Sequence, residues 1–229
     1  MIIGGIQKLS LIDFPGKIST VIFTQGCDFF CPFCHNPDLL PFLKDGAILE
    51  SDFFDHISKN LKMIEGVCIT GGEPTMQPDL PLFIRKIKEL GLSVKLDTNG
   101  SSPETLQKLF ESKALDYVAM DIKTTWDNYA LAIRSKNPEM SAQKAKESLS
   151  VISSSGVDHE FRTTVFPGVH KMDDFISMAG YLRDGEKYFI QNIRLEKTLG
   201  NITPEEKISA ADVASRIKEK YPNLIVDWR

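Results

Sequence analysis

Cysteine is scarce in this 229-residue chain, which has four, and three of them fall within one eight-residue window. Long apolar runs are absent: none reaches the roughly 18–20 residues of a membrane span. The N-terminus lacks the basic start and apolar core of a signal peptide. No internal repeat, low-complexity tract or Gly/Ser linker interrupts the sequence. We therefore expect one cytoplasmic domain, residues 1–229, with reduced thiols and no membrane partner.

A strong excess of either charge is also missing. The formal net charge is −4, with 42% apolar and 25% charged residues, which is ordinary for a globular protein. Such a balance gives no general attraction to nucleic acid, so we expect no nucleic-acid partner.

What the chain does have is Cys27, Cys31 and Cys34 in the spacing C-x3-C-x2-C, directly after an apolar run. Clustered thiols in a reducing compartment indicate a soft metal, either zinc or an iron–sulfur cluster. The nearest fourth zinc ligand is His35, and sequence neighbours rarely reach the same tetrahedral ion. Three sulfurs suit a four-iron cubane that keeps one iron free for a small molecule. Cys68 is interpreted as a small buried strand residue rather than a fourth ligand, which would close that iron.

Short β-branched runs alternate with amphipathic stretches, which predicts βα units around a parallel sheet. Six βα repeats favour a partial barrel over an eight-fold one of about 250 residues. Before the repeats, Gly5–Ile12 is interpreted as a leader that the structural turn Asp13–Gly16 connects to the first strand. Strands are expected at about Ser19–Thr24, Val67–Thr70, Ser93–Asp97, Tyr117–Asp121, His159–Val165 and Tyr188–Ile193, with a short edge strand at Leu224–Val226.

The helices between these strands have recognisable ends and faces. The first is expected over about Ser51–Met63, with Phe54, Ile57, Leu61 and Ile64 on one face. Ser102-Pro103 predicts a helix start, and Thr203-Pro204-Glu205-Glu206 matches a capping box. The last helix is expected to bury Ala210, Val213, Ile217 and Tyr221.

Residues that could take part in binding or catalysis stand where predicted strands end. Cys27, Gly71, Asp97 and Asp121 follow four successive strands. In parallel βα proteins these ends meet at one edge of the sheet, which predicts a shared pocket. Each motif also has a structural explanation by itself. Gly71–Pro74 and Asp97–Gly100 can be turns, Asp121 and Lys123 a surface pair, and Arg162 a surface ion pair.

The C-x3-C-x2-C motif with Phe33 before its last cysteine resembles the signature of the radical S-adenosylmethionine (radical SAM) superfamily. Cys34-His35-Asn36-Pro37 resembles glycyl-radical-enzyme activases, and the opening through Asn36 is most similar to activating proteins of anaerobic ribonucleoside-triphosphate reductase. The resemblance implies an α/β fold, a partial (β/α)6 barrel with parallel strands. It also implies a [4Fe–4S] cluster on the three clustered cysteines and S-adenosyl-L-methionine (SAM) as cofactor.

The resemblance further implies roles for individual residues. Gly71, Gly72 and Glu73 would hold the amino group of SAM, and Arg162 its carboxylate. Asn99 would lie near the ribose.

Other positions follow from the same resemblance. Asp97, Thr98 and Asp121 would coordinate a monovalent cation beside the cofactor carboxylate, since oxygen ligands suit a hard cation. Phe33 could pack against the adenine or shield the cluster, and Gln191 would border the adenine. Lys123 would contact a partner protein.

The implied activity is the transfer of a hydrogen atom from one glycine of a partner enzyme to a 5′-deoxyadenosyl radical. The expected partner is the large subunit of anaerobic ribonucleotide reductase, with pyruvate formate-lyase as the alternative and a flavodoxin- or ferredoxin-type electron donor. Two other functions stay open: a radical SAM enzyme acting on a small molecule, and a non-catalytic iron–sulfur or metal-binding module. Only the last leaves the glycine and aspartate motifs unexplained.

Overall fold

A curved sheet of eight strands forms the centre of the computed structural model, which describes residues 1–43, 45–193, 198–199 and 208–229. The strands lie side by side in the order of the sequence, and only the first pair is antiparallel. They are β1 (Ile3–Ser10), β2 (Ser19–Thr24), β3 (Gly66–Gly71), β4 (Ser93–Thr98), β5 (Tyr117–Asp121), β6 (Asp158–Thr164), β7 (Lys187–Gln191) and β8 (Ile225–Trp228). The predicted open, parallel α/β arrangement is confirmed.

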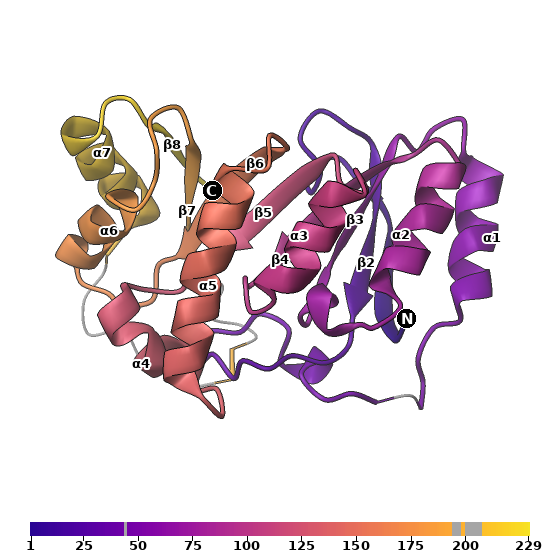
Figure 1. Cartoon of the computed structure of the whole chain (residues 1–229), viewed down its shortest axis with the longest axis horizontal. Helices are drawn as coiled ribbons and strands as arrows, with labels where there is room; N and C mark the ends of the chain where they lie inside the picture. The colour runs from indigo at the N-terminus through magenta and orange to yellow at the C-terminus, as the bar shows by residue number, and fades with distance from the viewer. Residues whose placement is uncertain (44, 194–197, 200–207) are drawn as a thin grey trace.

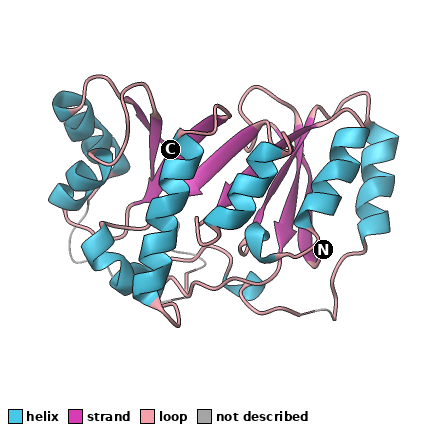
Figure 2. Cartoon of the chain, in the orientation of Figure 1, coloured by secondary structure: helices cyan, strands magenta, loops and turns pink. Residues whose placement is uncertain are grey.

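Helices cover the outer face of this sheet (Figures 1 and 2). The α-helices are α1 (Glu50–Asn60), α2 (Leu80–Glu89), α3 (Pro103–Glu111), α4 (Tyr129–Ile133), α5 (Pro138–Ser153), α6 (Met172–Ala179) and α7 (Ala210–Lys220). Three single turns of 3-10 helix are η1 (Pro37–Leu39), η2 (Pro74–Met76) and η3 (Trp126–Asn128). None of the described helices is both long and apolar enough to cross a membrane.

Apolar periodicity fixes the helices against the sheet. In α2, the side chains of Leu80, Phe83, Ile84 and Ile87 are buried, a spacing that places all four on one helical face. Successive side chains of a strand point to opposite faces of the sheet. One set therefore packs under the helices of the outer face, and the other points into the concave inner face. The chemistry-bearing residues of β4, β5 and β6 therefore share that inner face.

The predicted leader is wrong, because residues 3–10 form an edge strand. β1 pairs antiparallel with β2 across the turn that follows it. Two glycines obscure this strand in the sequence, since glycine has little strand preference. Gly4 has a packing reason to lack a side chain: a Cβ there would stand 2.5 Å from Leu39 Cδ2.

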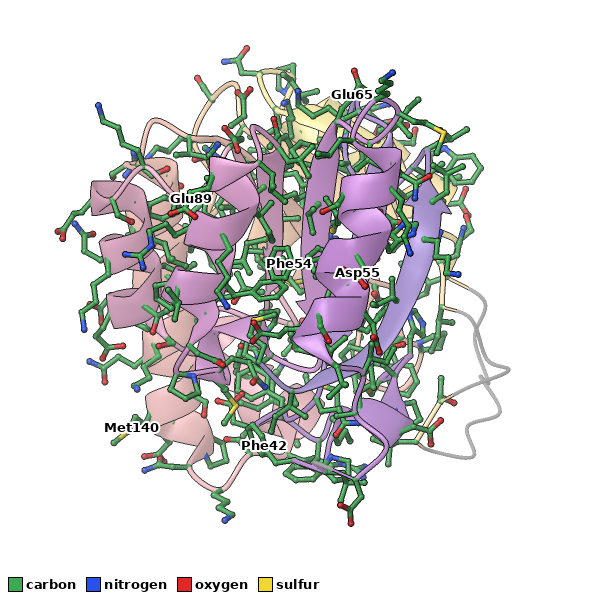
Figure 3. The ribbon with its side chains drawn as sticks, turned by 90° about the vertical axis from the view of Figure 1, so that its right-hand side faces the viewer. Phe42, Phe54, Asp55, Glu65, Glu89 and Met140 are labelled. Carbon is green, nitrogen blue, oxygen red and sulfur yellow. The ribbon has the colours of Figure 1, made fainter. Side chains whose placement is uncertain are left out.

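The predicted face of the first helix is partly wrong. The helix ends at Asn60, whose side-chain amide donates to the carbonyl of His56, so Leu61 lies beyond it and is exposed. Phe53 and Ile57 are the buried pair, whereas Phe54 packs sideways on Phe83 of α2, with ring centroids 5.4 Å apart. Figure 3 shows Phe54 in the space between α1 and α2.

Other predicted boundaries hold. Helix α3 starts at Pro103 after Ser102, although the Ser102 hydroxyl bonds to Thr105 Oγ1 instead of a backbone N–H. Helix α7 buries Ala210, Val213 and Ile217 but ends at Lys220, so Tyr221 lies just beyond it and is only partly buried. β8 is the predicted edge strand beside β7. The predicted capping box at 203–206 lies outside the described residues.

The turn between β1 and β2 closes one end of the sheet. Phe14 is 2% exposed and lies 6.3 Å from the ring of Tyr117, measured between centroids. A Cβ on Gly66 would stand 2.9 Å from the same ring. Phe14 thus fills the end of the concave face where β3 and β5 begin. The opposite end, where the strands terminate, is left for residues 25–43 and for α4 (Figure 1).

Candidate active site

A pocket opens at the carboxyl ends of the parallel strands. It is lined by all of the predicted site residues except Glu73, namely Cys27, Cys31, Phe33, Cys34, Gly71, Gly72, Asp97, Thr98, Asn99, Asp121, Lys123, Arg162 and Gln191. The strands bring these residues together because the residues follow the parallel strands or lie near their carboxyl ends. The shared pocket predicted from the strand ends is present.

The cysteine segment is anchored at its start. The backbone N–H groups of Gly26 and Cys27 donate to the carbonyls of Leu39 and Leu40, at 2.7 and 3.1 Å, so the chain returns to where it left the sheet. Within the loop, Cys34 N–H donates to the Cys31 carbonyl. The result is a closed loop whose three thiols face one cavity.

Burial disfavours the thiolate form of all three cysteines. Burial raises the pKa of Cys27, Cys31 and Cys34, that of Cys31 to about 11. Binding of a soft metal centre must therefore release protons, as thiolate ligation requires. Among the described residues, no three His, Cys, Asp or Glu side chains converge on a point where a single metal ion could bind.

Cys68 is separated from these thiols. It is 1% exposed in β3 and lies outside the pocket lining. Its sulfur is 3.8 Å from Lys95 Nζ and 3.9 Å from Asp97 Oδ1, on the inner face of the sheet below the pocket. The structure places it as a buried strand residue.

Two glycines let the backbone of the pocket wall approach the cysteine loop. Gly71 has a φ of +112°, which favours glycine, and a Cβ on Gly72 would stand 2.2 Å from the carbonyl oxygen of Gly26. Short backbone bonds join the two segments, from Gly72 N–H to the Thr24 carbonyl and from Glu73 N–H to the Gly26 carbonyl.

The carboxylate of Glu73 lies behind the pocket wall. It is 1% exposed and accepts hydrogen bonds from the N–H and hydroxyl of Thr75, the hydroxyl of Thr98 and the N–H of Asn99. Burial nevertheless raises the pKa of Glu73 to about 7. In this structure the side chain fixes the Thr98–Asn99 segment, a function that the motif alone did not indicate.

A buried ionic network crosses three strands below the pocket mouth. Arg162 on β6 donates from Nη1 to Asp97 Oδ2 at 3.0 Å and from Nε to Asp121 Oδ1 at 2.8 Å. The other oxygen of each carboxylate pairs with a lysine: Asp97 Oδ1 with Lys95, and Asp121 Oδ2 with Lys123 at 2.9 Å. Burial opposes ionisation, yet the ion pairs hold the pKa of both aspartates below the ordinary value.

Lys123 lines the pocket and does not project from the surface. Its ammonium lies 6.0 Å from the centroid of Phe33, which in turn packs on Phe166 at 5.0 Å. His170 donates from Nε2 to the Lys123 carbonyl at 2.7 Å and accepts the N–H of Phe166 at Nδ1. This histidine therefore positions the strand end that carries Lys123.

Sequence reasoning missed three side chains that organise the site. Asp28 accepts from Asn99 Nδ2 at 3.1 Å and from the Ser101 hydroxyl, which ties the cysteine loop to the end of β4. Lys95 and His170 act as described above. A signal existed for Lys95 alone, because a lysine inside an apolar strand run requires a buried partner. Gln191 lies at the pocket edge, where its Oε1 accepts from Thr164 at 3.5 Å.

Comparison with known proteins identifies relatives along most of the chain. A sequence model described as the radical SAM superfamily matches residues 21–181. A candidate glycyl-radical enzyme activating enzyme from Methanocaldococcus jannaschii is 36% identical over 192 residues, which is 83% of this chain and 79% of that protein. The pyruvate formate-lyase-activating enzyme of Clostridium pasteurianum is 27% identical over 233 residues, with 99% and 88% covered.

Solved structures show the same fold at lower identity. SuiB of Streptococcus suis, bound to S-adenosylmethionine, superposes with a TM-score of 0.67 at 17% identity over 91% of this chain. The enzyme anSMEcpe with bound AdoMet gives 0.61 at 17% identity over 90% of this chain. This chain spans about half of the SuiB chain, 49%, and 61% of the anSMEcpe chain.

Proposed function

Because this chain belongs to the radical SAM superfamily, we propose that it activates a partner enzyme by generating a glycyl radical on it. One observation carries the proposal. The three clustered thiols share a single pocket with the paired glycines, the strand-end aspartates and the buried arginine. A metal-binding module needs only the thiols. An enzyme that also binds a cofactor needs the glycines, aspartates and arginine that form the rest of the pocket.

The donor set fits the [4Fe–4S] cluster that the family implies. Cys27, Cys31 and Cys34 supply three soft ligands from one anchored loop, and the sulfur of Cys68 is held away beside Lys95. When bound and reduced, the cluster supplies the electron that splits SAM into methionine and a 5′-deoxyadenosyl radical, which takes a hydrogen atom from a glycine α-carbon.

Residues of this chain would bind and orient SAM around that centre. Gly71 and Gly72 have no side chains, so the cofactor amino group can approach their backbone. Arg162 keeps Nη2 without a protein acceptor among the described residues and can donate to the SAM carboxylate. Asn99 would reach the ribose, and Gln191 would border the adenine.

The apolar side of the pocket would exclude competing hydrogen donors. Phe33 is 4% exposed and packs on Phe166 at the pocket wall. A rigid aromatic wall keeps other hydrogen donors away from the reacting carbon and fixes its position.

The preferred partner is the large subunit of anaerobic ribonucleotide reductase, on the resemblance of the opening through Asn36. Pyruvate formate-lyase is the second candidate, favoured by the Clostridium pasteurianum relative that aligns over 99% of this chain. Contact of Lys123 with the partner, a flavodoxin- or ferredoxin-type donor and a cytoplasmic location stay predictions. The monovalent cation expected on Asp97, Thr98 and Asp121 has support from the resemblance alone.

The test is anaerobic incubation of the iron-reconstituted protein with SAM, a strong reductant and one candidate partner at a time. Electron paramagnetic resonance should detect a glycyl radical with the reductase. No signal should form with Cys31→Ala or with a reductase whose radical-bearing glycine is alanine. A glycyl radical formed only with pyruvate formate-lyase would make that enzyme the partner in place of the reductase. Absence of SAM cleavage in every mixture would leave the metal-binding module as the function.

A further inference from the structure

The aspartates predicted to bind a monovalent cation already have cationic partners. Asp97 lies between Lys95 and Arg162, and Asp121 lies between Arg162 and Lys123. All four carboxylate oxygens accept from a nitrogen of one of these three side chains. A hard cation needs several free oxygens at one point, and the network leaves none of these four without a donor.

Arg162, at the centre of the network, lies between the two carboxylates, where a shared cation would have to bind. Arg162 reaches from β6 across β5 to β4 and joins the two carboxylates through two different nitrogens, at 3.0 and 2.8 Å. A guanidinium is a rigid fork that cannot be deprotonated in proteins, so it bridges the pair at every pH of interest.

The balance of charge also disfavours an added ion. Three cationic side chains face two carboxylates, which leaves one positive charge beside the pocket. The neighbouring Glu160 also acts on Arg162, but its carboxylate is paired with Arg229. The SAM carboxylate would neutralise the remaining charge, whereas a metal cation would add a second positive charge to a buried site.

We propose that Arg162, supported by Lys95 through Asp97, takes the place of a monovalent cation, so that SAM binding by this chain requires neither Na⁺ nor K⁺. The inference rests on the proposed function, because it presumes that SAM binds in this pocket. Lys95 is then a positioning residue. It is 2% exposed, lies outside the pocket lining and holds the oxygen of Asp97 that Arg162 does not.

The experiment measures the dissociation constant of SAM by anaerobic calorimetry on the iron-reconstituted protein. Three buffers of equal ionic strength contain potassium, sodium or tetramethylammonium as the only monovalent cation. The wild-type constant should agree within about twofold among them, a difference worth about 0.4 kcal/mol. A loss of about tenfold or more in tetramethylammonium, restored by titrated K⁺, would overturn the inference. Failure to bind SAM in all three buffers would instead overturn the proposed function.

Variants test the assignment to particular residues. Arg162→Met exposes both carboxylates, so SAM affinity should fall by about tenfold or more in tetramethylammonium and recover in part with Na⁺ or K⁺. Lys95→Met should show the same dependence in weaker form, and Lys95→Arg should bind as wild type does. Lys187→Met removes a lysine from the neighbouring strand β7 and serves as the matched control, with no change expected.

Thermal unfolding of each variant identifies those that do not fold. The comparison of wild-type SAM affinity among the three buffers tests the inference even if no variant folds. A folded Arg162→Met whose remaining affinity is the same in all three buffers would also contradict the inference, because the freed aspartates would then attract no cation.

Discussion

A Cβ built on Gly72 would stand 2.2 Å from the carbonyl oxygen of Gly26, the residue before the first cluster cysteine. Both partners are backbone, so neither can rotate away as a side chain would. At the residue scale, the glycine pair after β3 therefore sets how closely the pocket wall approaches the cysteine loop. Because these glycines have no side chains, the cofactor could also reach the backbone there.

Gly72→Ala should force that contact apart. We expect a loss of about 1–3 kcal/mol in the free energy of unfolding, the usual range for overpacking, and a lower iron content after reconstitution. Denaturant titration and iron analysis measure both. Gly5→Ala is the matched control, since its Cβ would make only ordinary contact with Phe23 at 3.7 Å. Equal stability of the two variants would contradict this view of the loop.

Glu73 should make the stability of the metal-free protein depend on pH. Burial raises its pKa from 4.5 to about 7. Between these values the folded state keeps a proton that the unfolded state releases, so the stabilisation is full below about pH 4.5 and is lost as pH rises through about 7. The contribution is at most about 3 kcal/mol.

Denaturant unfolding at about pH 5, 6.5 and 8 measures this contribution. Wild type should lose stability over that range relative to Glu73→Gln, which stays neutral at every pH. Glu65→Gln, which changes an acceptor for the Ile18 N–H at the opposite end of β3, should keep the wild-type slope. Parallel curves for wild type and Glu73→Gln would rule out a raised pKa.

At the scale of elements, the turn between β1 and β2 closes the sheet through one side chain. Phe14→Ala should cost about 3–5 kcal/mol of unfolding free energy, because a buried aromatic ring leaves a cavity against Gly66 and Tyr117. Ile12→Ala, two residues earlier and 77% exposed, should stay within about 0.5 kcal/mol of wild type. Urea denaturation compares the two, and a similar small loss for both would mean that the turn does not close the sheet.

Elements were predictable where local pattern and tertiary role agree. The parallel strands are buried apolar runs that end in polar residues, so β2 to β7 could be located from the sequence. β1 could not, because Gly4 and Gly5 suppress the strand signal and only pairing with β2 orders the segment. The face of α1 was misassigned because the helix stops at Asn60, before the periodicity of apolar residues does.

The location of the candidate site was also predictable, because it follows from the arrangement of the strands. Topology brings the ends of parallel strands together, so motifs at those ends had to share a pocket. The partners of those motifs were not predictable. Arg162 on β6 meets Asp97 on β4, and Asp28 meets Asn99 across a loop, so only the folded chain shows that these groups neutralise or fix one another.

On the scale of the whole molecule, the sheet divides the cysteines between two environments. The loop at the strand ends presents Cys27, Cys31 and Cys34 to the pocket, and the interior of β3 holds Cys68 among charged groups. A cubane on the loop would therefore have three protein ligands and one iron open to the cofactor. The proposed radical chemistry depends on that open iron.

Mössbauer spectroscopy of protein reconstituted anaerobically with ⁵⁷Fe, recorded with and without SAM, tests this directly. The account predicts that SAM changes the signal of one iron of the cubane and leaves the other three as they were. Cys68→Ala should behave identically, and Cys31→Ala should fail to hold the cluster. A spectrum that SAM does not alter, or loss of the cluster in Cys68→Ala, would contradict the account.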